Sequence, residues 1–232
     1  MTWPDEEPAA LSLATDESYR ILRSRIDFSP LPKFSRDVTE RVIHASADFD
    51  YYTDLVCDEE WLAEGVAALA AGAPVITDSV MVAAGITASP VLCKIGEPLT
   101  RRLARSASIS RAAAATRLAF GEVGPSAFWV VGGGPEALAE ILARNVEPAF
   151  VVGLPVGFVG AAEAKEALRA SRLPSVSNVS EKGGPAVAVA AFNALVRNAL
   201  AVTGTLAGWD PSGGASAAEQ VAALADDDGA DW

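Results

Sequence analysis

Residues 126–152 read SAFWVVGGGPEALAEILARNVEPAFVV. The stretch opens with a short apolar run (126–131), turns at three consecutive glycines and continues in PEALAEILARN (135–145). Its proline stands at the first position of an expected helix, where the missing N–H costs nothing. A second apolar run, AFVV (149–152), follows at once. Short apolar strands separated by a helix are typical of a parallel sheet covered on both faces, so the stretch predicts an α/β fold.

The same alternation extends along most of the chain. Further strands are expected at 74–77, 91–95 and 175–179, and further helices at 16–25, 36–47, 59–71, 98–118, 161–171 and 185–202. Asp58 is a natural cap for the helix at 59–71, and Gly72 stands just past its end. We therefore predict one α/β domain of three layers, with a mainly parallel sheet and helices on both faces.

Both ends of the chain differ in composition from its middle. Residues 1–12 carry two prolines and an acidic triplet and are expected to be flexible. Residues 206–232 hold six acidic side chains and no Lys or Arg, among Gly, Ser and Ala, and are expected to be disordered. The α/β domain is accordingly placed at 13–205.

Composition excludes several classes of function. The formal net charge of −12 argues against nucleic acid and against an anionic membrane surface, since both require clustered cations. The longest apolar stretch, 148–162, contains Gly and Pro and is too short to cross a bilayer. Cys57 and Cys93 are the only cysteines, which indicates neither a disulfide framework nor a metal-binding cluster. These features favour a cytoplasmic protein.

The turn Gly132-Gly133-Gly134 admits more than one interpretation. A glycine turn between a strand and a helix is typical of dinucleotide sites. Such a site also needs a carboxylate at the end of the next strand, where this chain has Val152-Gly153-Leu154-Pro155, so NAD(P) is disfavoured. Two alternatives stay open: a tight structural turn, or a turn whose N–H groups receive the carboxylate of another ligand. A nucleophile elbow and a Walker A loop are absent from the sequence.

Four segments together resemble one known family. They are VIHASADFDY (42–51), GAPVITDSVMVAAGI (72–86), VVGLPVGFVGAAEAKEAL (151–168) and EKGGPAVAVAAFNAL (181–195). They are similar, in order and spacing, to the signature segments of the precorrin-8X methylmutases, and the similarity covers about residues 16–200. The resemblance implies a homodimer without a cofactor that moves a methyl group between neighbouring ring carbons of precorrin-8X, or of its cobalt form, giving hydrogenobyrinate or cobyrinate. The sequence does not decide between the two substrates.

His44 is the predicted catalytic residue. It is the only histidine of the chain, and histidine suits proton transfer near neutral pH. The resemblance implies the same role, because IHAS matches the position of the family's histidine, which protonates a ring nitrogen. Glu40 precedes His44 by one helical turn and is expected to orient the imidazole.

A corrin precursor carries many carboxylates, so local positive charge is expected at the site. Six basic residues fall between Lys94 and Arg117 against one acid, Glu97, and could hold the substrate or form a solvated helix face. The resemblance implies substrate contacts at Arg111, Ser110 and Ser18. We add Lys182 and the distinctive Asp78 and Met81, although Met81 could equally belong to the core. Backbone groups of Gly132, Gly133, Gly134, Gly157, Phe158, Gly183 and Gly184 complete the predicted pocket.

The chain departs from the family pattern at several of these places. Glu17 replaces an arginine, Ala112 a serine, Gly133 an asparagine, Glu136 a threonine and Pro185 a serine. Each change removes a donor or a cation, or adds an anion. An alternative hypothesis is therefore a non-catalytic paralogue that binds a corrinoid or another tetrapyrrole.

Overall fold

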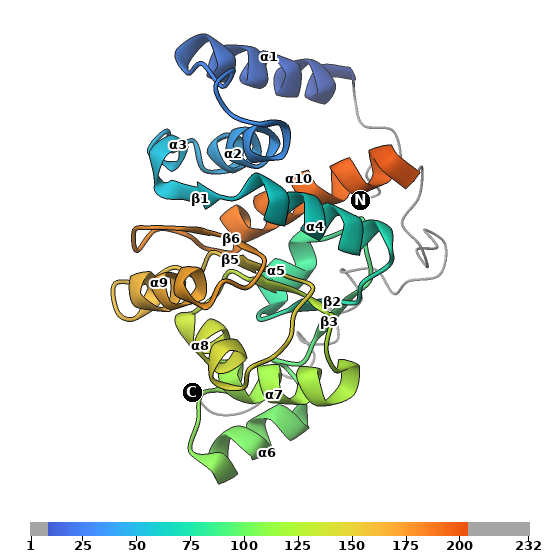
Figure 1. Ribbon diagram of the computed structural model, residues 1–232, viewed down its shortest axis with the longest axis vertical. Helices are drawn as coiled ribbons and strands as arrows, with labels where there is room; N and C mark the ends of the chain where they lie inside the picture. The colour runs from blue at the N-terminus through green and yellow to red at the C-terminus, as the bar shows by residue number, and fades with distance from the viewer. Residues whose placement is uncertain (1–8, 204–232) are drawn as a thin grey trace.

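The computed structural model describes residues 9–203 as an α/β domain of three layers (Figure 1). The helices are α1 (Ala9–Arg25), α2 (Lys33–Ser46), α3 (Tyr51–Asp54), α4 (Glu59–Ala70), α5 (Val80–Gly85), α6 (Pro98–Ala107), α7 (Arg111–Val123), α8 (Pro135–Ala143), α9 (Ala161–Ser171) and α10 (Pro185–Thr203). The strands are β1 (Leu55–Cys57), β2 (Val75–Thr77), β3 (Val91–Cys93), β4 (Phe128–Val131), β5 (Phe150–Gly153) and β6 (Ser175–Asn178).

The strands form one mixed sheet in the order β1-β6-β5-β4-β2-β3. All neighbours are parallel except β1, which pairs with β6 in the antiparallel direction. This confirms the predicted fold class and mainly parallel sheet. The chain order changes direction between β4 and β2, because β3 lies outside β2 while β5 and β6 follow on the other side.

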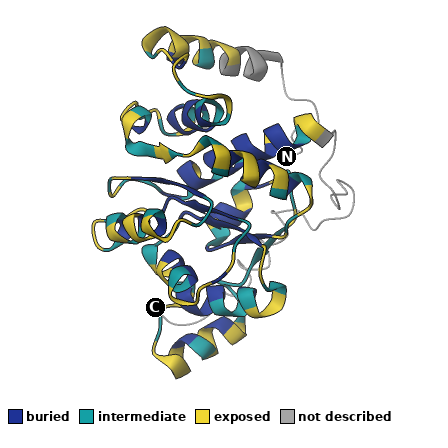
Figure 2. Cartoon of the chain, viewed as in Figure 1, coloured by how far each residue is buried: buried dark blue, intermediate teal, exposed yellow. Residues whose placement is uncertain are grey.

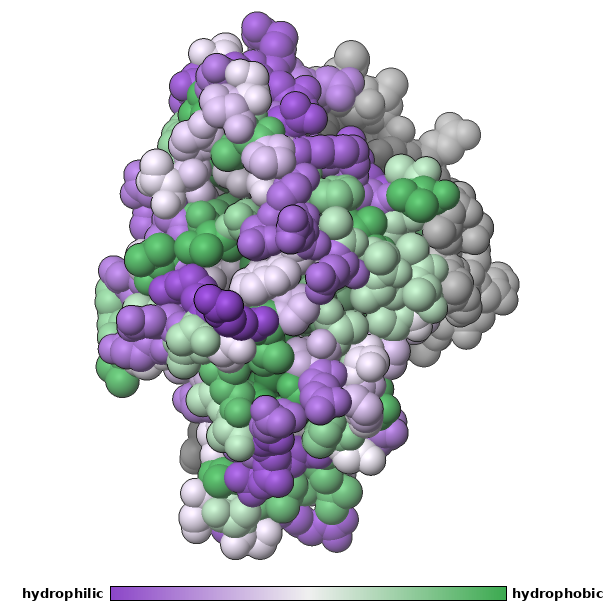
Figure 3. Space-filling view, viewed as in Figure 1, coloured by the Kyte–Doolittle hydropathy of each residue, from purple (hydrophilic) through white to green (hydrophobic). Residues whose placement is uncertain are grey.

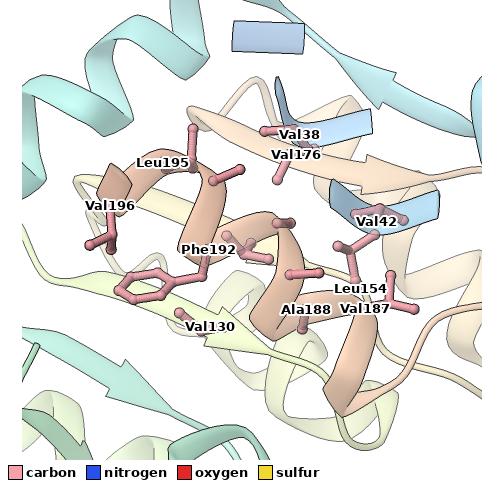
Figure 4. Close-up of a cluster of buried hydrophobic side chains, with 14 of the residues drawn as sticks. Val38, Val42, Val130, Leu154, Val176, Val187, Ala188, Phe192, Leu195 and Val196 are labelled. Carbon is pink, nitrogen blue, oxygen red and sulfur yellow. The ribbon is translucent and has the colours of Figure 1, made fainter. Parts of the chain in front are cut away.

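Alternate residues of the central strands point into two separate cores. Phe128 and Val130 of β4 face one core, with α2, α4, α5 and α10, whereas Trp129 and Val131 face the other, with α7, α8 and α9. Figure 4 shows the first core around α10, and Figure 2 shows the buried sheet between layers of helices, of which the outer helices are exposed on one side. The ring of Phe128 packs in the first core against two other aromatic rings. It stacks on Phe150, with 5.1 Å between ring centroids, and packs edge-on against Phe192, with 5.4 Å between centroids.

Several local predictions were wrong. The helix expected over 98–118 is broken into α6 and α7, because Ser108 adopts a left-handed conformation and Ser110 caps a new helix. Residues 9–12, expected to be flexible, belong to α1. The strand β1 and the short helices α3 and α5 were not predicted. The expected flexibility of residues 1–8 and disorder of the acidic tail lie outside the described residues.

Helix α10 is the central helix of the first core. Its residues Pro185–Val202 are long and apolar enough to cross a membrane by length and composition. In this structure the helix packs against α2, α4, α5 and the sheet, so its apolar character is explained by burial in the core.

Candidate functional site

The point where the strand order reverses lies between β2 and β4, a place where open α/β sheets commonly bind ligands. Here Asp78, directly after β2, reaches across to the turn after β4. Its carboxylate accepts hydrogen bonds from the N–H groups of Gly132 (3.1 Å) and Gly133 (2.7 Å). Burial raises the pKa of Asp78, and these hydrogen bonds oppose that effect.

The glycine turn therefore already holds a carboxylate, and it belongs to the protein. Asp78 occupies the N–H groups that a dinucleotide phosphate or a substrate carboxylate would need at Gly132 and Gly133. A side chain at Gly133 would also not fit, because its Cβ would lie 2.8 Å from Oδ2 of Asp78. Asp78 thus positions this turn, and the role of the two glycines as direct ligand contacts stays a prediction.

Two further loops lie at the same carboxyl edge and are hydrogen-bonded to each other. The N–H of Gly157, after β5, donates to the carbonyl of Glu181, after β6, at 3.1 Å. The N–H of Gly184 donates to the carbonyl of Leu154 at 2.9 Å. Gly183 packs so closely that an added Cβ would lie 2.4 Å from the Leu154 carbonyl oxygen, and its φ of +149° also favours glycine.

Lys182 joins this edge to the chain that follows α2. Its ammonium contacts carboxylate oxygens of Asp48 (2.7 Å) and Asp50 (2.6 Å). The hydrogen bond from Lys182 lowers the pKa of Asp48, and the two acids raise the pKa of Lys182. Lys182, predicted to bind a substrate carboxylate, is therefore paired with two carboxylates of the protein.

The structure brings His44 close to this edge, one turn before Asp48 on the same segment. Its ring stacks on that of Tyr19 of α1, with 4.3 Å between centroids and 5° between planes. The expected pairing of Glu40 with His44 is not found. Instead the carboxylate of Glu40 accepts two hydrogen bonds from Arg23, at 3.0 and 2.8 Å, because α1 packs across this face of α2.

A cavity of about 770 Å³ lies beside Tyr19, between α1, α2 and α10. Its volume lies in the range of small-molecule sites. On α2 it is lined by Asp37, Glu40 and Arg41, so His44 continues the same helix face one turn further on. Four arginines line the cavity: Arg20, Arg23, Arg41 and Arg197. In the view of Figure 3, hydrophilic side chains gather over this end of the molecule.

Two of these arginines are available for a ligand. Arg20 pairs with Glu17 at 2.5 Å, and Arg23 pairs with Glu40 at 2.8 Å. Arg41 and Arg197 make no ion pair with any residue that the structure describes. Sequence reasoning missed both, since Arg41 and Arg197 are 156 positions apart and meet only through the packing of α2 on α10. The spacing of Arg41 three residues before His44 was the one signal that could have found it.

The remaining predicted site residues are distributed more widely. Ser18 is exposed on α1, next to Tyr19. Met81 is 68% exposed, so the alternative that it belongs to the core was wrong, and Phe158 is 93% exposed. Ser110 accepts a hydrogen bond from the N–H of Ala113 as the cap of α7, and Arg111 is exposed in the first turn.

The predicted basic cluster is partly neutralised. Lys94 pairs with Glu97 and Glu122, each at 2.7 Å, and Arg117 pairs with Glu140 at 2.6 Å. Helix α7 covers the face of the sheet opposite to α2, and α6 packs on α7. The cluster and His44 therefore belong to different layers.

The chain matches the family described as precorrin-8X methylmutase over residues 14–198. It is 40% identical over 163 residues to the cobalt-precorrin-8 methylmutase of Methanocaldococcus jannaschii, which covers 68% of this chain and 77% of that protein. It is 34% identical over 197 residues to the precorrin-8X methylmutase of a Sinorhizobium species, covering 80% and 93% respectively.

Solved structures agree with these similarities. The precorrin-8X methylmutase of Thermus thermophilus superposes with a TM-score of 0.74 and 30% sequence identity, covering 83% of this chain and 98% of that one. A structure described as a precorrin-8X methylmutase related protein gives a TM-score of 0.70 and 28% identity, covering 77% and 98%. The match spans both cores and every strand of the sheet, and this chain therefore belongs to the precorrin-8X methylmutase family.

Proposed function

We propose that this chain is an isomerase of cobalamin biosynthesis that moves a methyl group between adjacent ring carbons of precorrin-8X or its cobalt form. The observation that supports this most is His44, whose ring stacks on Tyr19, a residue that lines a cavity with two unpaired arginines. One C–C bond to the methyl group breaks and another forms, so no atom is gained or lost. His44 donates a proton to a ring nitrogen during the shift and accepts it back afterwards.

The substrate's carboxylates are held by the cavity and by the edge loops. Arg41 and Arg197 bind side-chain carboxylates. Ser18, exposed on α1 next to the cavity residue Tyr19, stays a candidate contact. The loops at the carboxyl edge of the sheet supply the remaining contacts, through Gly134, Gly157, the exposed Phe158, Gly183 and Gly184. Four other predicted residues fix these loops through contacts within the protein: Asp78, Gly132, Gly133 and Lys182. Ser110 and Arg111 remain candidate contacts from the other layer.

The test is to mix the purified protein with metal-free precorrin-8X and to follow the visible spectrum, which reports the conjugation of the ring. The spectrum of hydrogenobyrinate is expected. A bound spectrum without conversion, followed by no conversion of the cobalt form, would favour the alternative of a non-catalytic binder. His44→Ala is expected to abolish conversion and to retain binding. Full turnover by this variant would refute the role of His44.

The homodimer belongs to this proposal as well. Val156, Phe158, Val159 and Met81 are exposed apolar side chains that follow strands β5 and β2 at the carboxyl edge. An apolar edge of this kind fits a second copy of the chain. Phe158→Ser is expected to shift the sedimentation coefficient toward that of a monomer, whereas a wild-type monomer would refute the dimer. A cytoplasmic location is proposed on the two free thiols, Cys57 and Cys93.

A further inference from the structure

Lys165 of α9 is a fully buried lysine to which the reaction assigns no role. Its ammonium donates to Oδ1 of Asn178 (2.8 Å) and to the carbonyl oxygens of Ser180 (2.5 Å) and Lys182 (2.6 Å). A lysine has three N–H donors, and all three are used here. Since burying a charge costs several kcal/mol when it is not compensated, these three acceptors are what makes the position tolerable.

A carboxylate holds the same loop in the complementary way. Asp54 accepts hydrogen bonds from Nδ2 of Asn178 (2.8 Å), from the N–H of Val179 (3.1 Å) and from the N–H of Ser180 (2.8 Å). Burial opposes ionisation of Asp54, but these hydrogen bonds outweigh it and lower its pKa. The ammonium of Lys165 thus donates to carbonyl oxygens of the 178–182 loop, and the carboxylate of Asp54 accepts hydrogen bonds from its N–H groups.

The direction of these bonds fixes two peptide planes at the substrate edge. In a trans peptide the C=O and the following N–H point in opposite directions. Because the carbonyls of Ser180 and Lys182 point to the buried ammonium, the N–H groups of Glu181 and Gly183 point away from it. Glu181 is exposed and Gly183 is half-buried. Neither N–H group has an acceptor among the described residues. Pro185, where the family has serine, contributes no N–H of its own.

We propose that Lys165 is a positioning residue of the isomerase, which holds the 178–184 loop from below so that the N–H of Gly183 is presented to a substrate carboxylate. Lys165 itself does not touch the substrate. The inference rests on the proposed function, because it requires this loop to be part of the corrin-precursor site.

The test compares Lys165→Met with Leu168→Ala, both assayed well below their melting temperatures. Leu168 is equally buried on the same helix, but it packs in the apolar core shared with α7 and α8. Its truncation is therefore a control for simple destabilisation of α9. Lys165→Met is expected to raise KM about tenfold, the equivalent of one lost hydrogen bond to a charged group, with kcat within about threefold. Leu168→Ala is expected to lower the melting temperature and to leave KM unchanged.

A second measurement uses the unmodified protein, in case Lys165→Met does not fold. Burial lowers the pKa of Lys165 to about 8, with charged Asp54, Arg169 and Glu181 nearby. Above that pH the neutral amine of Lys165 has only two N–H donors and loses one of its three hydrogen bonds to the loop, so KM should rise. Lys182, whose pKa is raised, remains charged in this range and does not contribute to the change. A KM that stays level between pH 7 and 9.5, or a Lys165→Met variant with wild-type KM, would overturn the proposal.

Hydrogen exchange separates this inference from the isomerase assignment. In the wild-type protein the N–H groups of Val179 and Ser180 donate to Asp54, and the N–H of Lys182 donates to Oγ of Ser180. In Lys165→Met these three N–H groups are expected to exchange faster, and in Leu168→Ala they are not. If the wild-type protein does not convert either substrate, the proposed function fails, and exchange alone decides whether Lys165 holds the loop. Unchanged exchange in Lys165→Met overturns the positioning role in either case.

Discussion

Lys165 should also give the protein a distinctive dependence of stability on pH. Burial lowers its pKa in the native state from 10.5 to about 8. Between these two values the unfolded chain keeps the proton and the native chain does not, so the free energy of unfolding rises with pH. A difference of 2.5 pH units corresponds to about 3 kcal/mol over the whole window, and about 2 kcal/mol of it falls between pH 8 and 9.5.

Other groups titrate in this range with the opposite sign. Burial raises the pKa of Cys57 and of Tyr51 to about 12, so the native state keeps protons that the unfolded state loses above about pH 9 and pH 10. Their contribution lowers stability as pH rises, but it is the same in the wild-type protein and in Lys165→Met. The difference between the two proteins therefore isolates the lysine.

The assay is urea unfolding of both proteins, with a reducing agent, at pH 7.5 and pH 9.5. From pH 7.5 to pH 9.5, the free energy of unfolding of the wild-type protein should rise by about 2 kcal/mol relative to that of Lys165→Met. If the two free energies of unfolding change in parallel, to within about 0.5 kcal/mol, Lys165 does not titrate as its burial requires. The three acceptors would then compensate the burial of the ammonium fully, and the reasoning from a lowered pKa would be refuted.

Three further predictions concern the site. Asp78→Ala leaves two buried N–H groups without an acceptor and should lower the free energy of unfolding by about 2–4 kcal/mol, with Asp78→Asn in between; a loss below about 1 kcal/mol would contradict the bridge across the sheet. Arg197→Gln should raise KM about tenfold, as expected for one lost contact to a carboxylate, whereas the matched control Arg102→Gln on α6 should leave it unchanged. Glu136→Thr should lower KM severalfold, because the carboxylate of Glu136 folds back on the glycine turn and would repel a substrate carboxylate there. It lies so close to Gly134 that an added Cβ would be 2.3 Å from its Oε2. An unchanged KM would place the substrate elsewhere.

The sheet was predictable because its signals are local. Most of the predicted strands are short apolar runs beside a turn. The cap of α4 was predictable in the same way, and the side chain of Asp58 accepts a hydrogen bond from the N–H of Trp61 as expected. The break between α6 and α7 also had a local signal, since Ser110 is a typical cap, but it was interpreted as a substrate contact. The strand β1 has only three residues and forms through pairing with β6, more than a hundred positions away.

The connections within the site were not predictable from the sequence. Asp78 contacts residues 54 and 55 positions further on, and Lys182 contacts Asp48, 134 positions back. A motif identifies the residue type at each end of such a contact without showing which partners meet. For this reason the contacts of Lys182 and Asp78 within the protein were not predicted, and the cavity arginines were not singled out.

The departures from the family pattern can now be placed in the fold. Glu17 is exposed and pairs with the cavity residue Arg20, Glu136 lies against the glycine turn, and Pro185 begins α10. Glu17 and Glu136 are exposed and Pro185 is half-buried, and each change alters the charge or the hydrogen-bond donors at its position. The groups that fix the loops are the half-buried Asp54 and the buried Asp78 and Lys165, and each has several hydrogen-bond partners within the protein. Since His44 and the contacts that fix these loops are intact, the departures are expected to alter affinity for the substrate and to leave the methyl shift itself unchanged.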